Sequence, residues 1–261
     1  MIKIALIGHE YRYEAFQIAS LFYDKNNIEF VDQGKADILC IYNEDEKTCT
    51  TKIIGSKEFS RDDSTSKKEI KLGIKGTLLN ALKYLTGKES DWGILVGIRP
   101  TKLYHDFLLT GMNTQEIRDT LINNYYLSED KADLLIEVAL AEKPFLSYKD
   151  RSVGVYIGIP FCPTRCSYCS FASNPLGGNK HLVDDYLSSL IKEIKHTFSL
   201  IKDRGINVDT LYIGGGTPTS LNELQLEKLF KTVSENIKTD DIREYTVEAG
   251  RPDSINESKL K

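Results

Sequence analysis

Three cysteines lie close together in the 261-residue chain, at Cys162, Cys166 and Cys169. Their spacing is C-x₃-C-x₂-C, and they follow an apolar run that is typical of a β-strand. Three thiolates can hold three irons of a [4Fe–4S] cube and leave the fourth iron without a protein ligand, open to a chelating cosubstrate. Two alternatives stay open: a zinc site with His181 as the nearest downstream fourth ligand, and buried cysteines with no metal.

Two further groups of residues follow the next two predicted strands. Gly214–Thr217 comes after a strand expected at 210–213, and Glu248 ends a strand expected at 244–248. Consecutive glycines let a ligand approach the backbone and offer N–H groups to an anion, and a carboxylate can accept from an amine or from ribose hydroxyls. Because ligands bind at the carboxyl edge of parallel strands, we expect both groups to join the cysteines in one site. The alternatives are a tight turn and a surface glutamate.

The elements that must position these groups alternate between strand and helix after about residue 150. The expected strands are 153–157, 210–213 and 244–248, and the expected helices are 185–203 and 221–236. Such alternation predicts βαβ units and a parallel sheet. Three strands cannot close a barrel, so we expect the sequence to be a C-terminally truncated piece of a longer protein.

The first 148 residues follow a different pattern, which predicts a separate domain before the one at 149–261. Residues 44–69 are polar and are expected to form a weakly structured connection. The other expected strands are 3–7, 28–31 and 37–42, and the expected helices are 11–23, 71–86, 100–109, 114–124 and 128–142. We therefore expect a small α/β unit with a helical extension.

The composition is that of an ordinary globular protein, with 41% hydrophobic and 28% charged residues and a formal net charge of −4. This balance argues against a general nucleic-acid or membrane-surface binder. The first residues lack the features of a signal peptide, and no apolar run approaches the roughly 18 residues of a membrane span. The odd number of cysteines argues against a disulfide framework. We expect a cytoplasmic protein without a membrane or nucleic-acid partner.

The motifs resemble those of the radical S-adenosylmethionine (SAM) superfamily, and more closely those of the oxygen-independent coproporphyrinogen III oxidases, also called coproporphyrinogen dehydrogenases. The resemblance lies in Tyr156–Phe171, Gly214–Thr219 and Val247–Pro252. The segment Trp92–Lys102 resembles the N-terminal extension of one branch, the HemZ-like proteins. The resemblance implies an α/β fold in which residues 149–261 form the first half of a partial (β/α)₆ barrel.

The resemblance also implies roles for individual residues. Cys162, Cys166 and Cys169 would ligate a [4Fe–4S] cluster, and its open iron would bind the amino and carboxylate groups of SAM. The positions that match SAM contacts are Tyr156, Tyr168, Gly215, Gly216, Thr217 and Glu248. The alternative is that Tyr156 is a core aromatic residue of its strand and that Tyr168 only packs beside the cluster.

The activity that the resemblance implies is oxidative decarboxylation of coproporphyrinogen III to protoporphyrinogen IX in haem biosynthesis. SAM, reduced through a donor such as flavodoxin or ferredoxin, would yield a radical that removes hydrogen from two propionate side chains. Phe171 stands where such oxidases commonly carry a further cysteine, whereas phenylalanine is common in the haem-chaperone branch and in HemZ-like members. A haem-binding chaperone and a radical SAM enzyme with another substrate therefore remain as alternatives.

Overall fold

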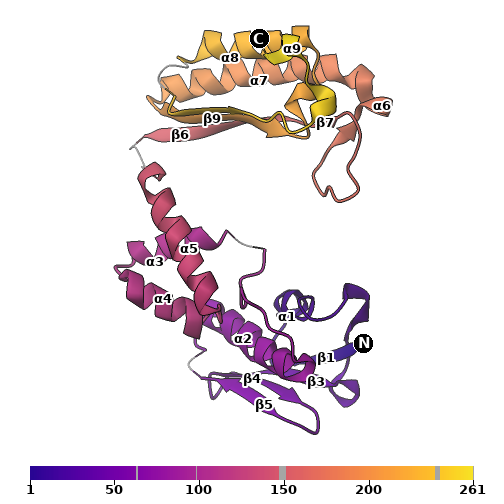
Figure 1. Ribbon diagram of the computed structural model, residues 1–261, viewed down its shortest axis with the longest axis vertical. Helices are drawn as coiled ribbons and strands as arrows, with labels where there is room; N and C mark the ends of the chain where they lie inside the picture. Colours follow the sequence, from indigo (N-terminus) through magenta and orange to yellow (C-terminus); the bar gives the residue numbers. More distant parts are fainter. Residues whose placement is uncertain (63, 98, 147–150, 239–241, 261) are drawn as a thin grey trace. The chain divides into compact units, whose positions relative to one another are not determined.

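The computed structural model describes residues 1–62, 64–97, 99–146, 151–238 and 242–260. The chain divides into two compact units, Met1–Leu146 and Ser147–Lys261 (Figure 1). The domain boundary expected between residues 148 and 149 falls on residues outside the described part of the chain, and it stays a prediction.

The first unit contains a five-stranded sheet in the order β2-β1-β3-β4-β5. The strands are β1 (Ile2–Ile7), β2 (Ile28–Phe30), β3 (Ile38–Asn43), β4 (Thr48–Ile53) and β5 (Glu58–Arg61). Strand β1 is parallel to both of its neighbours, and β3, β4 and β5 are antiparallel. The three strands predicted at the start of the chain are confirmed.

The weakly structured connection expected at 44–69 is wrong, because this segment contains β4, β5 and the start of a long helix. In β4, Cys49, Thr51 and Ile53 are buried while the residues between them face outward. The turn between the two strands contains Gly55 at a φ of 72°. A polar composition concealed this alternation, since threonine suits a half-buried strand as well as a loop.

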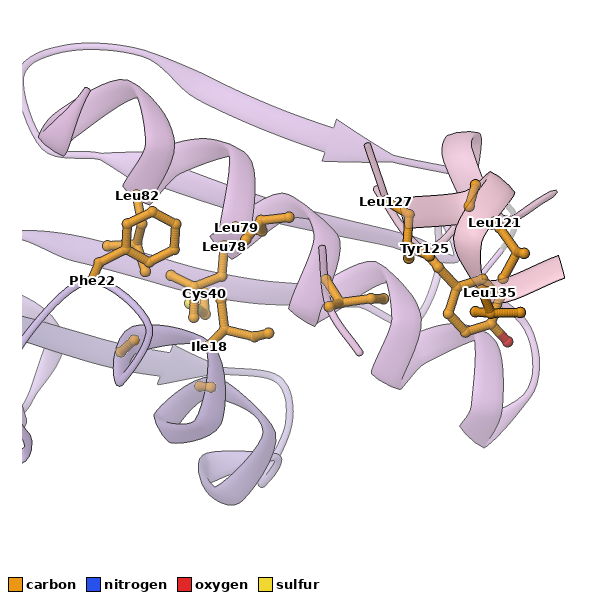
Figure 2. Close-up of a cluster of buried hydrophobic side chains, with 14 of the residues drawn as sticks. Ile18, Phe22, Cys40, Leu78, Leu79, Leu82, Leu121, Tyr125, Leu127 and Leu135 are labelled. Atoms are coloured by element: carbon orange, nitrogen blue, oxygen red, sulfur yellow. The ribbon is translucent and has the colours of Figure 1, made fainter. Parts of the chain in front are cut away.

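Helices of the first unit share one core with its sheet. They are α1 (Arg12–Ala19), α2 (Lys67–Thr86), α3 (Pro100–Leu109), α4 (Thr114–Asn123) and α5 (Glu129–Glu142), close to the predicted ranges. Helix α2 begins with a capping box of Ser66 and Glu69 and ends at Gly87 in the left-handed region. Figure 2 shows the core passing from Ile18 and Leu78 near the sheet to Leu135 in α5.

The second unit is built on a three-stranded parallel sheet in the order β10-β9-β6. Its strands are β6 (Ser152–Ile159), β9 (Asn207–Gly215) and β10 (Glu244–Val247), with a short parallel pair, β7 (Phe161–Cys162) and β8 (Asn174–Pro175). Its helices are α6 (Leu176–Asn179), α7 (Val183–Asp203), α8 (Glu223–Asn236) and α9 (Glu257–Leu260). The α/β class, the strand–helix alternation and the parallel sheet are confirmed.

The two faces of this sheet differ in chemistry. Helices α7 and α8 cover one face of the sheet (Figure 1). Ile157 and Ile213 are buried in the core on that face. Because side chains alternate along a strand, the residues between them lie on the other face. There the register places Tyr156 beside Tyr212, and glycines occupy the next pair of positions along both strands. The face opposite the helices therefore carries tyrosines and backbone rather than aliphatic side chains.

None of the helices in the described ranges is both long and apolar enough to cross a membrane.

Replacing Leu78 with alanine tests the core of the first unit. Leu78 in α2 is fully buried, and removing such a side chain typically costs about 2–5 kcal/mol through lost burial and the cavity left behind. We expect urea unfolding followed by circular dichroism to show a loss of this size in the transition of the first unit. Leu109→Ala is the control, because Leu109 is 81% exposed and such changes stay within about 0.5 kcal/mol. Equal effects of the two variants would contradict the assigned core.

Candidate functional site

The three clustered cysteines lie on and beyond β7, where the chain leaves the carboxyl end of β6. The backbone N–H and the side-chain amide of Asn174 both donate to the carbonyl of Pro160, at 2.7 and 3.2 Å, and so close the base of loop 163–173. Cys162 is buried, whereas Cys166 and Cys169 are partly exposed, and all three are free of disulfides. Cys162 together with loop 163–173, which we call the cysteine loop, therefore brings three thiols to one edge of the sheet.

The end of β9 and the residues after it, Gly214–Thr217, which we call the glycine turn, pack against the segment Ile159–Cys162. The N–H of Gly216 donates to the carbonyl of Ile159 at 2.8 Å. A Cβ on Gly216 would stand 2.7 Å from the carbonyl oxygen of Phe161 and 3.0 Å from the Cys162 sulfur, and one on Gly215, at a φ of +114°, would stand 3.0 Å from Ile159 backbone atoms. Glycine is thus required at both positions for the two segments to approach, whether or not a ligand also uses the turn.

Thr217 extends this contact between the turn and the first cysteine. Its side chain is buried, and its hydroxyl donates to the Cys162 sulfur at 3.4 Å. The following short 3₁₀ helix, Pro218–Ser220, adds a hydrogen bond of 3.3 Å from the Ser220 hydroxyl to the carbonyl of Phe161. The glycine turn and β7 consequently form one packed element at the carboxyl edge of the sheet.

Glu248 meets two tyrosines above Gly214. Its N–H donates to the carbonyl of Ile213, and its Oε1 accepts a hydrogen bond of 2.6 Å from the Tyr212 hydroxyl. Tyr156 stacks on Tyr212 with ring centroids 5.6 Å apart and planes 13° from parallel. A Cβ on Gly214 would stand 2.6 Å from Tyr212 Cε1 and 3.0 Å from both Glu248 Cδ and the Tyr156 hydroxyl. The missing side chain at this position lets the three groups converge.

Both tyrosines are protonated at neutral pH, and their surroundings raise their pKa values further above the ordinary value. The hydrogen bond to Glu248 raises the pKa of Tyr212, and burial followed by the Glu248 charge raises the pKa of Tyr156. Tyr212 therefore acts as a donor that orients the Glu248 carboxylate, and in the described part of the chain nothing is hydrogen-bonded to the other oxygen of that carboxylate.

A cavity of about 650 Å³ opens on this face of the sheet. Its lining residues are Gly154, Val155, Tyr156, Phe171, Ala172, Thr210, Tyr212, Gly215 and Glu248. This volume is within the range of about 300–1,000 Å³ that small-molecule sites have. The structure thus brings Tyr156, Gly215 and Glu248 from the predicted site together with Phe171 from the cysteine loop.

Tyr168 stands apart from that cavity. It is 88% exposed, on the cysteine loop, and a hydrogen bond with Cys166 is the main reason that the pKa of Tyr168 is raised. Its predicted contact with SAM stays a prediction.

The chemistry of the donor set suits a [4Fe–4S] cluster, since three free thiols lie on one loop. Across the described ranges, no three His, Cys, Asp or Glu side chains are gathered tightly enough to hold a metal ion, and this includes the zinc alternative with His181. The ligand roles of Cys162, Cys166 and Cys169 stay predictions.

Two residues of this region were not singled out from the sequence. Tyr212 had a readable signal, because the triplet Tyr-Ile-Gly occurs in both strands and parallel pairing aligns the two copies. Arg251 lies in Val247–Pro252, a segment that carries the family resemblance, but nothing in the sequence indicates its partners. It contacts Thr164 and Cys166, which precede it by more than 80 residues, and only the tertiary structure joins them.

No family model and no solved structure matches the chain. It is 36% identical over 277 positions to the oxygen-independent coproporphyrinogen-III oxidase-like protein HemZ of Bacillus subtilis, a match covering 99% of this chain and 55% of the relative. It is 42% identical over 107 residues to the heme chaperone HemW of the same bacterium, covering 41% of this chain and 27% of HemW. For the oxygen-independent coproporphyrinogen III oxidase of Escherichia coli the identity is 36% over 101 residues, covering 39% of this chain and 21% of the oxidase.

These likenesses, with the parallel sheet and the cysteine loop at its carboxyl edge, place the chain in the radical SAM superfamily. Within it, the chain belongs to the oxygen-independent coproporphyrinogen III oxidase family, in which its likeness to HemZ extends over both units. The chain spans about half the length of that relative and about a quarter of the other two.

The exposure of the five thiols predicts an order of reactivity in the metal-free protein. Cys166 and Cys169 should react with iodoacetamide at pH 8 about tenfold or more faster than Cys40, because a thiolate must form and be reached. Burial raises the pKa of Cys40 to about 12, and burial also raises the pKa of Cys49. Peptide mass spectrometry over time measures each site, with urea-unfolded protein as the control in which all five react. Rapid labelling of Cys40 in the folded protein would contradict this order.

Proposed function

We propose that this chain contains the cluster- and SAM-binding part of a radical SAM oxidoreductase, which converts coproporphyrinogen III to protoporphyrinogen IX without oxygen. The observation that carries the proposal is the meeting of the cysteine loop, the glycine turn and Glu248 at one edge of a parallel sheet. The match to HemZ along 99% of this chain supports it.

In this proposal Cys162, Cys166 and Cys169 hold a [4Fe–4S] cluster. When bound, the cluster and SAM supply the one-electron chemistry that removes hydrogen atoms from the substrate. Each of two propionate side chains then loses a hydrogen atom, carbon dioxide and one electron, which passes to a one-electron acceptor, and becomes a vinyl group. A small reducing protein such as a flavodoxin or ferredoxin serves as the electron donor, and the reaction takes place in the cytoplasm.

The remaining predicted residues orient SAM. Glu248, held by the Tyr212 hydroxyl through one oxygen, has its second oxygen to accept from the amine or ribose hydroxyls of SAM. Tyr156 lies beside that carboxylate and offers a ring and a protonated hydroxyl. We assign the backbone at Gly215, Gly216 and Thr217 to the SAM side of the site, and Tyr168 to its outer rim on the cysteine loop.

The proposal extends to the fold. The three-stranded sheet is the first half of a partial (β/α)₆ barrel, with residues 149–261 as its incomplete domain and residues 1–148 as an extension. Support comes from the unequal faces of the sheet, because helices cover one face and the tyrosine pair and cavity lie on the other. In barrels of parallel strands with outer helices, the carboxyl edge carries the site.

A haem-binding chaperone is the second candidate function. The heme chaperone HemW matches residues of this chain at 42% identity, and Phe171, rather than a cysteine, lines the cavity. A protein with this role binds haem and does not decarboxylate a porphyrinogen.

Anaerobic turnover by the full-length protein separates the candidates. After iron and sulfide are supplied and the cluster is reduced, we expect SAM to be consumed as coproporphyrinogen III becomes protoporphyrinogen IX, which chromatography of the oxidised porphyrins measures. Stoichiometric haem binding without turnover would favour the chaperone instead. Cleavage of SAM without any porphyrin product would favour a radical SAM enzyme with another substrate.

Single cysteine substitutions test the ligand set. Cys162→Ala, Cys166→Ala and Cys169→Ala should each lose most of the bound iron and the broad absorbance near 400 nm, because a cube held by three thiolates is labile with two. Cys49→Ala is the matched control, since Cys49 is buried in the first unit, and it should keep wild-type iron content. Full iron retention in any of the three loop variants would remove that residue from the ligand set.

A further inference from the structure

We propose that Arg251 is a positioning residue, which ties the cysteine loop to the turn after β10 and so sets the place of Cys166 for cluster assembly. The inference rests on the proposed function in one respect, that the loop receives a cluster. The tether itself is a property of the metal-free protein.

One side of the Arg251 guanidinium is fixed to its own turn. Its Nε and Nη2 donate to the two carboxylate oxygens of Asp253 at 2.9 and 2.6 Å. Such a two-pronged pair is stronger and more directional than a single hydrogen bond. The carbonyl of Arg251 accepts from the backbone N–H and the hydroxyl of Ser254, at 3.0 and 2.7 Å. These hydrogen bonds fix both the backbone and the side chain of Arg251 within its own turn.

The turn that carries Arg251 is joined to the 3₁₀ helix Pro218–Ser220, which follows the glycine turn. The Ser254 hydroxyl lies 2.6 Å from the hydroxyl of Thr219, and both side chains are buried. The ammonium of Lys259 donates to the carbonyls of Thr219 and Ser254, at 2.7 and 2.9 Å. The turn that carries Arg251 is thus held against the end of β9, next to the element that packs on Cys162.

The other side of the guanidinium holds the cysteine loop. Nη1 donates to the carbonyl of Thr164 at 3.0 Å, and Nη2 donates to its hydroxyl at 3.1 Å. Nη1 also lies 3.7 Å from the Cys166 sulfur. An arginine can make all these contacts at once because its five N–H groups form a rigid planar fork, which lysine lacks. The guanidinium stays charged over the working pH range, so a change of pH does not remove its donors.

Little else holds the outer part of the loop. Among the described residues, the remaining hydrogen bonds of 163–173 are internal, such as the one from the Cys169 N–H to the Cys166 carbonyl at 3.1 Å and that from Arg165 to the Cys169 carbonyl at 3.5 Å. Without Arg251 the segment around Cys166 would be less restrained relative to Cys162. A cluster that binds there would then have to order a looser loop, which costs conformational entropy.

The test compares Arg251→Gln, Arg251→Lys and Asp253→Asn in the full-length protein. Arg243→Gln is the matched control, because Arg243 makes a similar pair with Asp209, at 2.7 Å, on the same sheet. Brief trypsin digestion of the metal-free protein reports on the loop through cleavage after Arg165, followed by mass spectrometry. Iron and sulfide content and the electron paramagnetic resonance spectrum of the reduced, reconstituted protein report on the assembled cluster.

We expect Arg251→Gln to be cleaved after Arg165 several-fold faster than wild type, and to retain several-fold less iron with an altered spectrum. Arg251→Lys and Asp253→Asn should fall between these limits, and Arg243→Gln should match wild type in both measurements. If Arg251→Gln fails to fold, the lysine and asparagine variants carry the same comparison.

Wild-type cleavage and iron content in folded Arg251→Gln would overturn the inference. So would an equal effect of Arg243→Gln, because the arginine would then act only on general stability. If wild-type protein binds no cluster, the proposed function fails, while the rate of cleavage after Arg165 still decides whether the tether exists.

Discussion

Parallel pairing of β9 with β6 on one side and β10 on the other is the constraint on which the candidate site depends. Because parallel strands all point the same way, each chain segment that follows them emerges at one edge, and each crossover returns through a helix. The register then places Gly214 between Gly158 and the residue that follows β10, Glu248. Burial of apolar side chains under α7 and α8 holds this register, since a shift by one residue would turn them to the opposite face.

Missing side chains matter as much in this region as those present. Gly214 leaves the space in which Tyr212 meets Glu248, while Gly215 and Gly216 leave the space through which the cysteine segment passes. One run of three glycines therefore serves two sides of the strand end, a carboxylate on one and a thiol on the other. The same short turn can therefore contact both Glu248, which follows β10, and Cys162, which follows β6.

The cysteine loop is less buried and is held by fewer contacts than the sheet edge from which it emerges. Its first thiol is buried against Thr217, while the other two are partly exposed, and Arg251 from a distant turn contacts one of them, Cys166. Under the proposed function this loop receives an inorganic cluster, and a fixed end with a tethered middle would limit how far its thiols move apart.

Local sequence patterns by themselves determined the longer helices, six of the strands, the α/β class and the motifs at three strand ends, because periodicity, capping residues and cysteine spacing are properties of neighbouring residues. They did not indicate the short elements β7, β8, α6 and α9. They failed at β4 and β5. In β4 the buried residues Cys49 and Thr51 alternate with more exposed ones, and this pattern depends on the elements that pack on the strand. Only the tertiary structure decided that Tyr212 orients Glu248 and that Arg251 reaches Thr164. Those contacts join residues that are 36 and 87 positions apart in the sequence. Local patterns describe neighbouring residues only, so they cannot show which distant residues folding brings into contact.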